Sequence, residues 1–368
     1  MAQQTAVAPP AVAPCAWRRA AVRRGARRFA GLSNCAASAE PETFTIVGAS
    51  GRVGTALVAV CASAGVPHIP VRRDTDDGVF KDTSGPILVA THASDLDAVV
   101  RRVPRERHRD LVFLQGGLLR DGWLERRGLR HATQAALYLA AGTDTEKGTI
   151  FLRDGGGSSV AHGPRASDVV RLLALGGVAC AAVDERIFAA AALEKLLWAS
   201  SFWVLCAAGR ARRDDVVNDF EVTIPLTVGE IVDGSCVATK ARAERLLGEL
   251  FDVAAARRDF AFLFSRDSAD SEAREKTRAR RVAVENALAY SRSIPRAVPS
   301  REMAIKEASF RNGWFLMGLP DDDASSLEGG EKKNERSLHA RLLRRVGADP
   351  SALAADAAET HAHQETSR

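Results

Sequence analysis

The sequence lacks the cysteine patterns of zinc-binding and disulfide-rich proteins. Its six cysteines include no Cys-x-x-Cys pair. They are scattered along the chain, at Cys15, Cys35, Cys61, Cys180, Cys206 and Cys236. Because both kinds of framework need clustered cysteines, we expect neither a structural metal nor a disulfide scaffold. A His-x-His pair at His361 and His363 lies in a polar tail, where a metal site is not favoured either.

Acidic residues are absent before Glu40, whereas six arginines lie within residues 1–39. A segment rich in Ala and Arg, without the long apolar core of a secretory signal, is typical of an organelle transit peptide. We expect a chloroplast location, with the mitochondrion as the alternative; an ordinary N-terminal tail is the other interpretation. Without these six arginines the formal net charge of +5 becomes −1. The charge of the remaining chain therefore does not favour a nucleic-acid partner.

One apolar run, residues 187–208, is long enough to suggest a membrane span. Glu194 and Lys195 lie side by side near its middle, and two central charges make insertion into a bilayer unfavourable. We therefore predict a buried helix and no membrane partner. The 46% hydrophobic and 26% charged content is that of a globular protein, and 368 residues are enough for two domains.

Three glycines follow a short apolar segment at the start of the main body of the chain. Residues 43–54 read Thr-Phe-Thr-Ile-Val-Gly-Ala-Ser-Gly-Arg-Val-Gly and lead into an apolar helix start. Gly48 would permit a tight turn, Gly51 the approach of a phosphate, and Gly54 close packing of helix on strand. The helix amides and dipole would then face the anion. The pattern predicts a dinucleotide-binding turn, with a glycine-rich turn of another α/β protein as the alternative.

The second apolar segment bears on the identity of the cofactor. Residues 67–73 end in Arg72 and Arg73, where an NAD-binding fold carries an acidic residue. An arginine can pair with the 2′-phosphate of NADP in a bidentate arrangement. We therefore expect NADP(H). The alternative is that both arginines are solvated and that Asp74, Asp76 or Asp77 binds the ribose hydroxyls.

The scarcity of tyrosine excludes one class of dehydrogenase. The G-x-x-G-x-x-G spacing alone would suggest a short-chain dehydrogenase or epimerase, whose chemistry needs Tyr-x-x-x-Lys. The chain has two tyrosines. Tyr138 is followed four residues later by Gly142, and Tyr290 by Ile294. Neither tyrosine fits the motif.

Short apolar runs alternate with helical or loop stretches from residue 43 to about 185. We predict strands at 43–47, 67–72, 86–91, 110–115, 136–140, 149–152 and 178–183. Such alternation predicts an α/β Rossmann domain, a doubly wound parallel sheet with helices on both faces. The third run ends at Thr91 and His92 and the fourth at Gln115 and Gly116. Both are positions where such a sheet presents its strand ends to a ligand, although each is also compatible with a simple turn.

After residue 185 the pattern becomes helical. Helices are predicted at 187–208, 227–256, 273–291, near 301 and at 337–346, with a charged loop or insertion at 210–219. The expected domains are a transit peptide at 1–39, an NADP-binding Rossmann domain at 40–185 and an all-α substrate domain at 186–318. Residues 319–368 would form a linker, a short helix and a polar tail.

Lys195 is the first candidate for chemistry. A lysine inside an apolar helix is costly, and burial lowers its pKa and readies it for proton transfer. A reductase acting on a ketone needs a hydride donor, an acid to protonate the developing alkoxide, and groups that anchor the substrate. Lys195 could be that acid; the alternative is that it reaches the surface or pairs with a carboxylate.

A second set of polar residues lies between Ser291 and Phe315. Glu307 is followed by Asn312-Gly313, and Ser293 precedes them, with Ser291 as a competitor. With the Lys195 helix and the glycine turn, this set resembles ketopantoate reductase and its relatives in the superfamily with a 6-phosphogluconate dehydrogenase-like C-terminal domain. The resemblance covers roughly residues 43–318. It implies a catalytic lysine in a Lys-x-x-x-Asn-x-x-x-Asn helix, a serine, and a Glu-x-x-x-x-Asn-Gly segment that binds the substrate.

The chain departs from the family at several polar positions. Ala199 and Trp203 stand where the family helix carries asparagines, and Gly116-Gly117 stands in place of an Asn-Gly. His92 occupies the place of a family lysine. Because a site loses discrimination when its hydrogen-bonding groups vanish, ketopantoate itself is not favoured. We expect Trp203 to change the shape of the pocket.

The sequence thus predicts an NADP-dependent oxidoreductase acting on a small 2-oxo acid-like carbonyl compound, with a non-catalytic NADP-binding protein as the alternative. The expected partners are a small-molecule substrate and, as a candidate assembly, a second copy in a homodimer. Catalysis is assigned to Lys195 and Glu307, and substrate binding to Ser293, Asn312 and His92. Cofactor binding is assigned to Gly48, Ser50, Gly51, Arg52, Val53, Gly54, Arg72, Arg73, Thr91, Gln115 and Gly116.

Overall fold

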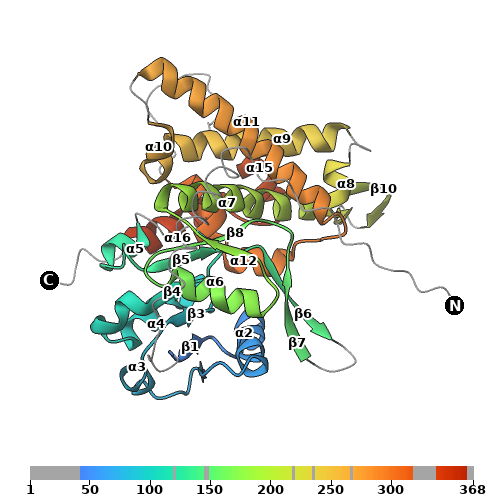
Figure 1. The fold of residues 1–368 in the computed structure, drawn as a ribbon. Helices are drawn as coiled ribbons and strands as arrows, with labels where there is room; N and C mark the ends of the chain where they lie inside the picture. Colours follow the sequence, from blue (N-terminus) through green and yellow to red (C-terminus); the bar gives the residue numbers. More distant parts are fainter. Residues whose placement is uncertain are drawn as a thin grey trace.

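The computed structural model places a seven-stranded sheet against a bundle of helices (Figure 1). It describes residues 42–117, 119, 122–144, 149–217, 220–233, 237–265, 268–317 and 337–362. The expected transit peptide, the expected linker, Cys15, Cys35, Cys236 and the side chains of the His361–His363 pair lie outside the described residues.

The sheet has the strand order β2-β1-β3-β4-β5-β8-β9. Neighbouring strands are parallel except β5 and β8, which pair antiparallel. The strands are β1 (Phe44–Val47), β2 (His68–Val71), β3 (Ile87–Val89), β4 (Leu111–Phe113), β5 (Thr133–Ala136), β8 (Ser159–His162) and β9 (Cys180–Ala182). After β2 the chain returns past β1 to form β3. A ligand crevice is expected where the order reverses, between β1 and β3.

Helices cover both faces of this sheet, which confirms the predicted doubly wound fold. One face buries Phe44 and Ile46 of β1 against α2 (Arg52–Ser63) and α6 (Ala166–Leu175). The other face buries Val47 and Val89 against a second group of helices. These are α3 (Val79–Asp82), η1 (Ala93–Asp95), α4 (Leu96–Arg102) and α5 (Trp123–Arg126), and η2 (Arg105–Asp110) leads into β4. Burial on both faces explains why the parallel strands are continuous apolar runs rather than alternating ones.

The helical half is built around α7 (Glu185–Ala208), which lies between the sheet and the other long helices (Figure 1). The Asp184 side chain caps α7 by accepting a hydrogen bond from the Ile187 amide at 2.9 Å. By length and composition α7 could cross a membrane, but 72% of its most apolar window is buried in the protein. Around it lie α8 (Val228–Val232), α9 (Val237–Ala256), α10 (Arg258–Phe264), α11 (Ala269–Ser293), α12 (Arg301–Lys306), η3 (Ser309–Gly313), α13 (Trp314–Leu316), α15 (Leu338–Arg345) and α16 (Pro350–Ala362).

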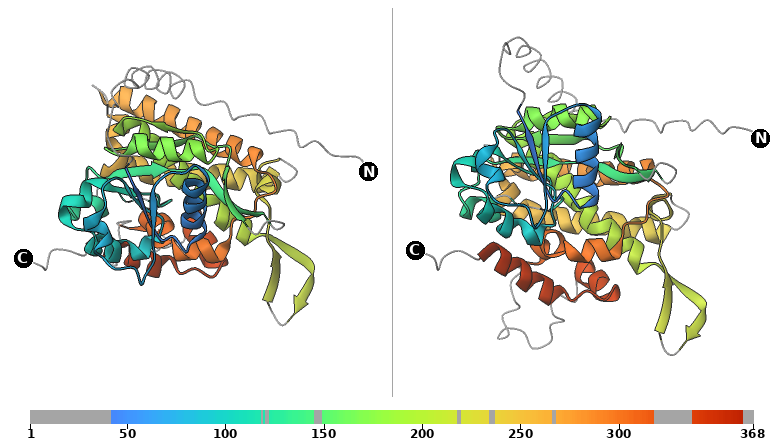
Figure 2. Two further views of the ribbon diagram at one scale, coloured as in Figure 1. Left: turned by 60° about the horizontal axis from the view of Figure 1, so that its bottom comes forward. Right: turned by 90° about the horizontal axis from the view of Figure 1, so that it is seen from below.

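Several predicted elements were wrong in detail. The charged stretch after α7, predicted as a loop or insertion, forms a hairpin of β10 (Arg210–Val217) and β11 (Phe220–Ile224), which projects from the helical half (Figure 2). Residues 139–144 and 149–154 form a separate hairpin, β6 (Leu139–Asp144) and β7 (Thr149–Asp154), outside the main sheet. The expected polar tail forms α16 as far as Ala362. The helix packs on η3 and α13, with Ala357 buried beside Gly313, a tertiary contact with no strong periodic signal in the sequence.

Candidate functional site

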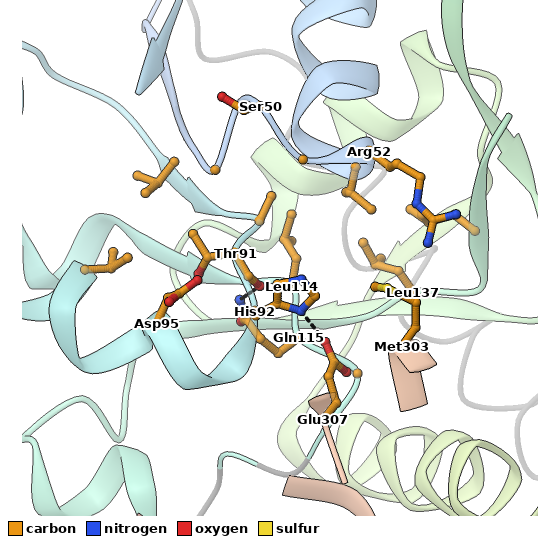
Figure 3. A pocket seen from close by; sticks show the side chains of 18 of the residues that line it. Ser50, Arg52, Thr91, His92, Asp95, Leu114, Gln115, Leu137, Met303 and Glu307 are labelled. Atoms are coloured by element: carbon orange, nitrogen blue, oxygen red, sulfur yellow. Dashed lines mark hydrogen bonds and ion pairs between the residues drawn. The ribbon is translucent and has the colours of Figure 1, made fainter. Parts of the chain in front are cut away.

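A cavity of about 1030 Å³ opens at the carboxyl ends of β1, β3 and β4, where the strand order reverses. Its walls come from both halves of the protein, and Figure 3 shows residues that line it. The volume is at the upper end of the range of about 300–1,000 Å³ typical of ligand pockets. The cavity therefore has room for a large ligand, or for a cofactor with a small substrate.

The glycine turn forms one wall of this cavity, and its backbone requires glycine. Gly48 has φ +83°, and a Cβ there would lie 3.0 Å from the carbonyl carbon of Ala90 on the neighbouring strand end. A Cβ on Gly54 would lie 2.2 Å from the Gly48 carbonyl oxygen, so α2 packs directly on the end of β1. The tight turn and the close helix packing predicted from the sequence are both present.

The N-terminus of α2 is open to an anionic group. It has no side-chain cap and no acidic residue in its first turn. Ser50, Gly51, Arg52 and Val53 line the cavity there. Uncapped amides at a helix N-terminus carry partial positive charge, which favours a phosphate.

The end of β2 presents the two predicted arginines. Arg72 and Arg73 are exposed at the cavity rim and have no ion pair with the described residues. Of the competing acids, Asp76 accepts a hydrogen bond from the Gly78 amide at 2.7 Å, and Asp77 accepts one from Arg102 at 2.6 Å. Asp74 lines the cavity beside the arginines.

The ends of β3 and β4 carry polar atoms that lack partners. The Gln115 amide nitrogen donates to the carbonyl oxygens of Val89 at 3.0 Å and Thr91 at 3.1 Å, which ties the two strand ends together. The buried Thr91 Oγ1 and Gln115 Oε1 have no hydrogen-bond partner among the described residues. A buried polar atom without a partner is costly, and a ligand that supplies the missing hydrogen bonds would remove this cost.

Charged side chains of the helical half meet these strand ends. Lys195 on α7, Glu307 after α12 and Arg311 on η3 all line the cavity. Arg311 Nη2 donates to Glu307 Oε2. Glu307 Oε1 lies 3.7 Å from His92 Nδ1, which follows β3 (Figure 3). The structure thus brings the two predicted catalytic residues and His92 into one cluster.

The pKa of Lys195 is lowered to about 8. Burial is the main cause, because it disfavours the charged ammonium. The Arg311 guanidinium lowers this pKa further, and the Glu307 carboxylate raises it. The ammonium makes no hydrogen bond or ion pair with the described residues, so its proton is available to a ligand.

Sequence reasoning missed Arg311 as a site residue. A Cβ on Gly116 would lie 2.8 Å from Arg311 Nη2 and 3.7 Å from Lys195 Nζ, so this glycine makes room for both cations. Arg311 lies on a single π-helical turn, a feature often found at functional sites. The Glu307–Arg311 spacing, i and i+4 on a helix, is the signal that could have identified the pair.

Three predicted site residues do not line the cavity. Gly54 acts through helix packing, and Ser293 Oγ donates to the Tyr290 carbonyl oxygen at 2.6 Å. Asn312 is fully buried in the helical half, so its assignment to substrate binding is corrected. Its amide nitrogen donates to the Ser200 carbonyl oxygen at 2.9 Å, and its oxygen accepts from Trp203 Nε1 at 2.9 Å.

Trp203 also differs from the prediction. It is 1% exposed and does not line the cavity, so it does not shape the pocket directly. It stands where the resemblance places an asparagine, and its indole instead bonds to Asn312 within the core. The Asn312 amide also contacts His339 Nε2 at 2.8 Å, and burial lowers the pKa of His339 to about 3.

Sequence reasoning also missed an aromatic wall, formed by Tyr138, Trp198 and Tyr290. All three residues line the cavity. The Tyr290 ring lies 4.8 Å from the Tyr138 ring and 5.0 Å from the Trp198 ring, both edge-to-face. The only tyrosines of the chain thus meet at this site, although their scarcity gave no such signal.

The described residues contain no group of three or more side chains suited to a metal ion. The buried Cys61 and Cys206 have raised thiol pKa values, about 11 and about 12, because burial disfavours the thiolate. Neither cysteine lines the cavity, whose ionisable groups include Lys195, His92, Glu307 and Arg311.

Comparison with known proteins finds similarity only at the level of solved structures. No protein-family model and no curated protein sequence matches the chain. A ketopantoate reductase of the PanE/ApbA family from Ralstonia eutropha JMP134 is 16% identical, with a TM-score of 0.46. The alignment covers 86% of this chain and 96% of that one.

Two further neighbours have similar statistics. A dimeric ketopantoate reductase from Staphylococcus aureus is 15% identical over 88% of this chain and 99% of its own, with a TM-score of 0.44. A D-mandelate dehydrogenase, solved with NADH and anilino(oxo)acetate, is 12% identical over 87% and 97%, with a TM-score of 0.47. These three solved structures are two ketopantoate reductases and one D-mandelate dehydrogenase.

Proposed function

We propose that this chain is an NADP-dependent oxidoreductase that reduces a small carbonyl compound of the 2-oxo acid type. The observation that carries the proposal is the position of Lys195. This lysine, whose pKa is lowered to about 8, lies in the same cavity as the glycine turn and the unpartnered polar atoms of the strand ends. A proton donor beside a dinucleotide cradle is the arrangement that a carbonyl reductase needs.

The residues of the cavity fit a dinucleotide. The glycine turn and the uncapped first turn of α2 suit the pyrophosphate. Arg72 and Arg73 suit the 2′-phosphate of NADP, because neither is neutralised by an ion pair with the described residues. Thr91 Oγ1 and Gln115 Oε1 suit the amide and hydroxyl groups of the nicotinamide riboside. NADPH, when bound, supplies a hydride to the substrate carbonyl carbon.

The side chains of the helical half carry the proton chemistry. The Lys195 ammonium donates its proton to the carbonyl oxygen as negative charge develops there. Burial and Arg311 lower the pKa of Lys195, whereas Glu307 raises it. With a pKa of about 8, the lysine is protonated at neutral pH. His92, whose Nδ1 lies 3.7 Å from the same carboxylate, connects the cluster to the end of β3.

Titration with NADPH and NADH, followed by turnover of a panel of 2-oxo acids, tests the proposal. Wild type should reduce at least one member, and Lys195→Ala should lower kcat by about 10²- to 10⁴-fold with unchanged NADPH affinity. Full turnover by Lys195→Ala would contradict the assignment. NADPH binding without reduction of any carbonyl compound would support the alternative, a non-catalytic NADP-binding protein.

Ala199 favours that alternative, because it leaves the cavity without the amide that the family resemblance implies.

We further propose that residues 1–39 direct the protein to the chloroplast, with the mitochondrion as the alternative. Their six arginines and lack of acidic residues support this. Fusion of residues 1–39 to a fluorescent protein should give plastid fluorescence in plant cells. The same fusion with all six arginines changed to glutamine should stay in the cytosol, and cytosolic fluorescence of both fusions would contradict the proposal.

A further inference from the structure

We propose that Arg102, the last residue of α4, determines the preference for NADPH over NADH by positioning the loop that follows β2 and by neutralising Asp77. The inference rests on the proposed function, because it concerns the nucleotide specificity of the same cavity. Arg102 lies 30 residues after Arg72 in the sequence, and only the fold brings the two together.

The loop after β2 carries more acidic than basic side chains. Its charged residues give a net charge of −1, and they are Arg72, Arg73, Asp74, Asp76 and Asp77. A phosphate monoester itself carries about −1.5 to −2 charges at pH 7. Like charges close together repel one another, so the loop by itself is a poor site for the 2′-phosphate of NADP.

Arg102 supplies the missing positive charge. Its Nε donates to Asp77 Oδ1 at 2.6 Å, and the two side chains are 25% and 56% exposed. With Arg102 included, the net charge of the loop rises from −1 to zero. Because solvent screens this ion pair in part, its effect on a bound phosphate should be moderate.

The same guanidinium holds the backbone of the loop. Nη2 of Arg102 donates to the Thr75 carbonyl oxygen at 2.6 Å, and Nη1 donates to the Arg72 carbonyl oxygen at 3.5 Å. The Arg72 amide donates to Thr75 Oγ1 at 2.9 Å, which closes the turn. A planar guanidinium can bind a carboxylate and two carbonyl groups at once, which the compact ammonium of a lysine cannot do.

Packing of α4 sets the position of Arg102. Its guanidinium carbon lies 5.8 Å from the centre of the buried Phe80 ring, within the range of a cation–π interaction. Leu96 and Val99 anchor α4 on the sheet, and Val99 lines the cavity together with Arg102. One side chain thus connects the wall of the cavity to the loop that carries Arg72.

Fluorescence titration of NADPH and NADH with the full-length protein tests the inference. Wild type should bind NADPH more tightly than NADH. Arg102→Gln should weaken NADPH binding roughly 5- to 30-fold, because it frees the Asp77 carboxylate and releases the turn. The affinity for NADH should stay within about twofold, since the glycine turn and the first turn of α2 are unchanged.

A second substitution separates the charge effect from a loss of structure. Asp77→Asn, added to Arg102→Gln, should recover part of the lost NADPH affinity, because the carboxylate that repels the phosphate is gone. Asp77→Asn alone should not weaken NADPH binding. Arg102→Lys keeps the charge without the forked geometry and should lose less affinity than Arg102→Gln.

Arg101→Gln is the matched control. Arg101 lies beside Arg102 in the last turn of α4, where a cation is favourable in any helix. It is exposed, does not line the cavity and has no ion pair with the described residues. Both affinities should therefore stay within about twofold of wild type.

The outcomes distinguish the inference from the proposed function. A wild-type preference for NADPH that persists in Arg102→Gln would overturn the inference and leave the proposed function intact. An equal loss for NADPH and NADH, or no recovery with Asp77→Asn, would also overturn it. Equal binding of both nucleotides by wild type would overturn the NADP assignment together with the inference. The expected affinities without reduction of any carbonyl compound would support the inference and overturn the proposed reaction.

Discussion

Burial disfavours the charge of Lys195, and no described residue accepts a hydrogen bond from its ammonium. It lies on a long apolar helix, and its pKa is lowered to about 8 by burial and by Arg311 against the opposing effect of Glu307. Both neighbours line the same cavity. At the scale of single residues, both neighbours therefore contribute to the pKa of Lys195, and changing either of them changes that pKa.

The rate of carbonyl reduction should fall as pH rises through about 8, because the reaction needs protonated Lys195. The reverse oxidation needs the neutral amine, so its rate should rise over the same interval. Arg311→Gln removes a charge that lowers this pKa and should move the midpoint upward, whereas Glu307→Gln should move it downward. Profiles of kcat against pH for wild type and both variants measure this; midpoints that coincide in all three would contradict the assignment of Lys195.

Lys195→Met should stabilise the protein by about 1–3 kcal/mol at pH 7, because it removes a charge from an apolar helix. The folded-state pKa of about 8 lies below the ordinary value of 10.5, so the unfolded chain binds more protons between these values. Wild type therefore gains stability as pH rises from about 8 to 10.5, and the advantage of Lys195→Met should shrink. Urea unfolding at pH 7 and pH 10 tests this.

The control for this experiment is Lys306→Met, at an exposed lysine paired with Glu302 at 2.9 Å. Its effect should stay within about 0.5 kcal/mol at both pH values. A gain as large as that of Lys195→Met would show that the effect does not come from burial.

At the scale of elements, the proposed cofactor site depends on the carboxyl ends of β1 and β2 and on the N-terminus of α2. Gly54 lets α2 pack on the Gly48 carbonyl, so the first helical turn is aimed into the cavity. The residues that follow β2 line the same cavity as the first turn of α2. The strand order alone brings these segments together, because β2 and β3 flank β1.

Changing Arg72 and Arg73 together to alanine should weaken NADPH binding by roughly 10- to 100-fold, because charge-assisted hydrogen bonds to the 2′-phosphate are lost. The affinity for NADH should change little. Fluorescence titration of both nucleotides measures the two affinities. An equal loss for NADPH and NADH, or none for either, would contradict the assignment of the phosphate site.

At the scale of the whole molecule, Asn312 joins three segments that are distant in sequence. Its side chain bonds to Trp203 and to the Ser200 carbonyl of α7, and it contacts His339 of α15. All four residues are fully or almost fully buried. This network holds η3, and hence Arg311, against α7.

Asn312→Ala should destabilise the protein by about 2–4 kcal/mol, because it leaves buried polar groups without partners. NADPH affinity should stay unchanged, since Asn312 does not line the cavity. Thermal unfolding and NADPH titration of the variant separate the two effects. A normal melting temperature with weakened substrate binding would restore the substrate-binding role first assigned to this residue.

Prediction from the sequence succeeded where a local pattern carries the physical cause. Gly48, Gly51 and Gly54 permit a tight βα turn directly after a strand, and the apolar runs alternate with helices over most of the sheet. Prediction failed where the cause lies in distant residues. β5 lies three residues before its predicted place, because its register is set by pairing with β4 and β8. The helix α16 depends on packing against η3.

The sequence by itself determined the fold class, the glycine turn and the position of Lys195 inside an apolar helix, because each is encoded within a short segment. The tertiary structure decided which residues share the cavity. Asn312 is buried in the core, where its oxygen accepts a hydrogen bond from Trp203. The residues that line the cavity with Lys195 include Arg311, Tyr138, Trp198 and Tyr290. These residues come from four separate segments, and only the packing of α7 between the sheet and the other helices brings them within reach of one ligand.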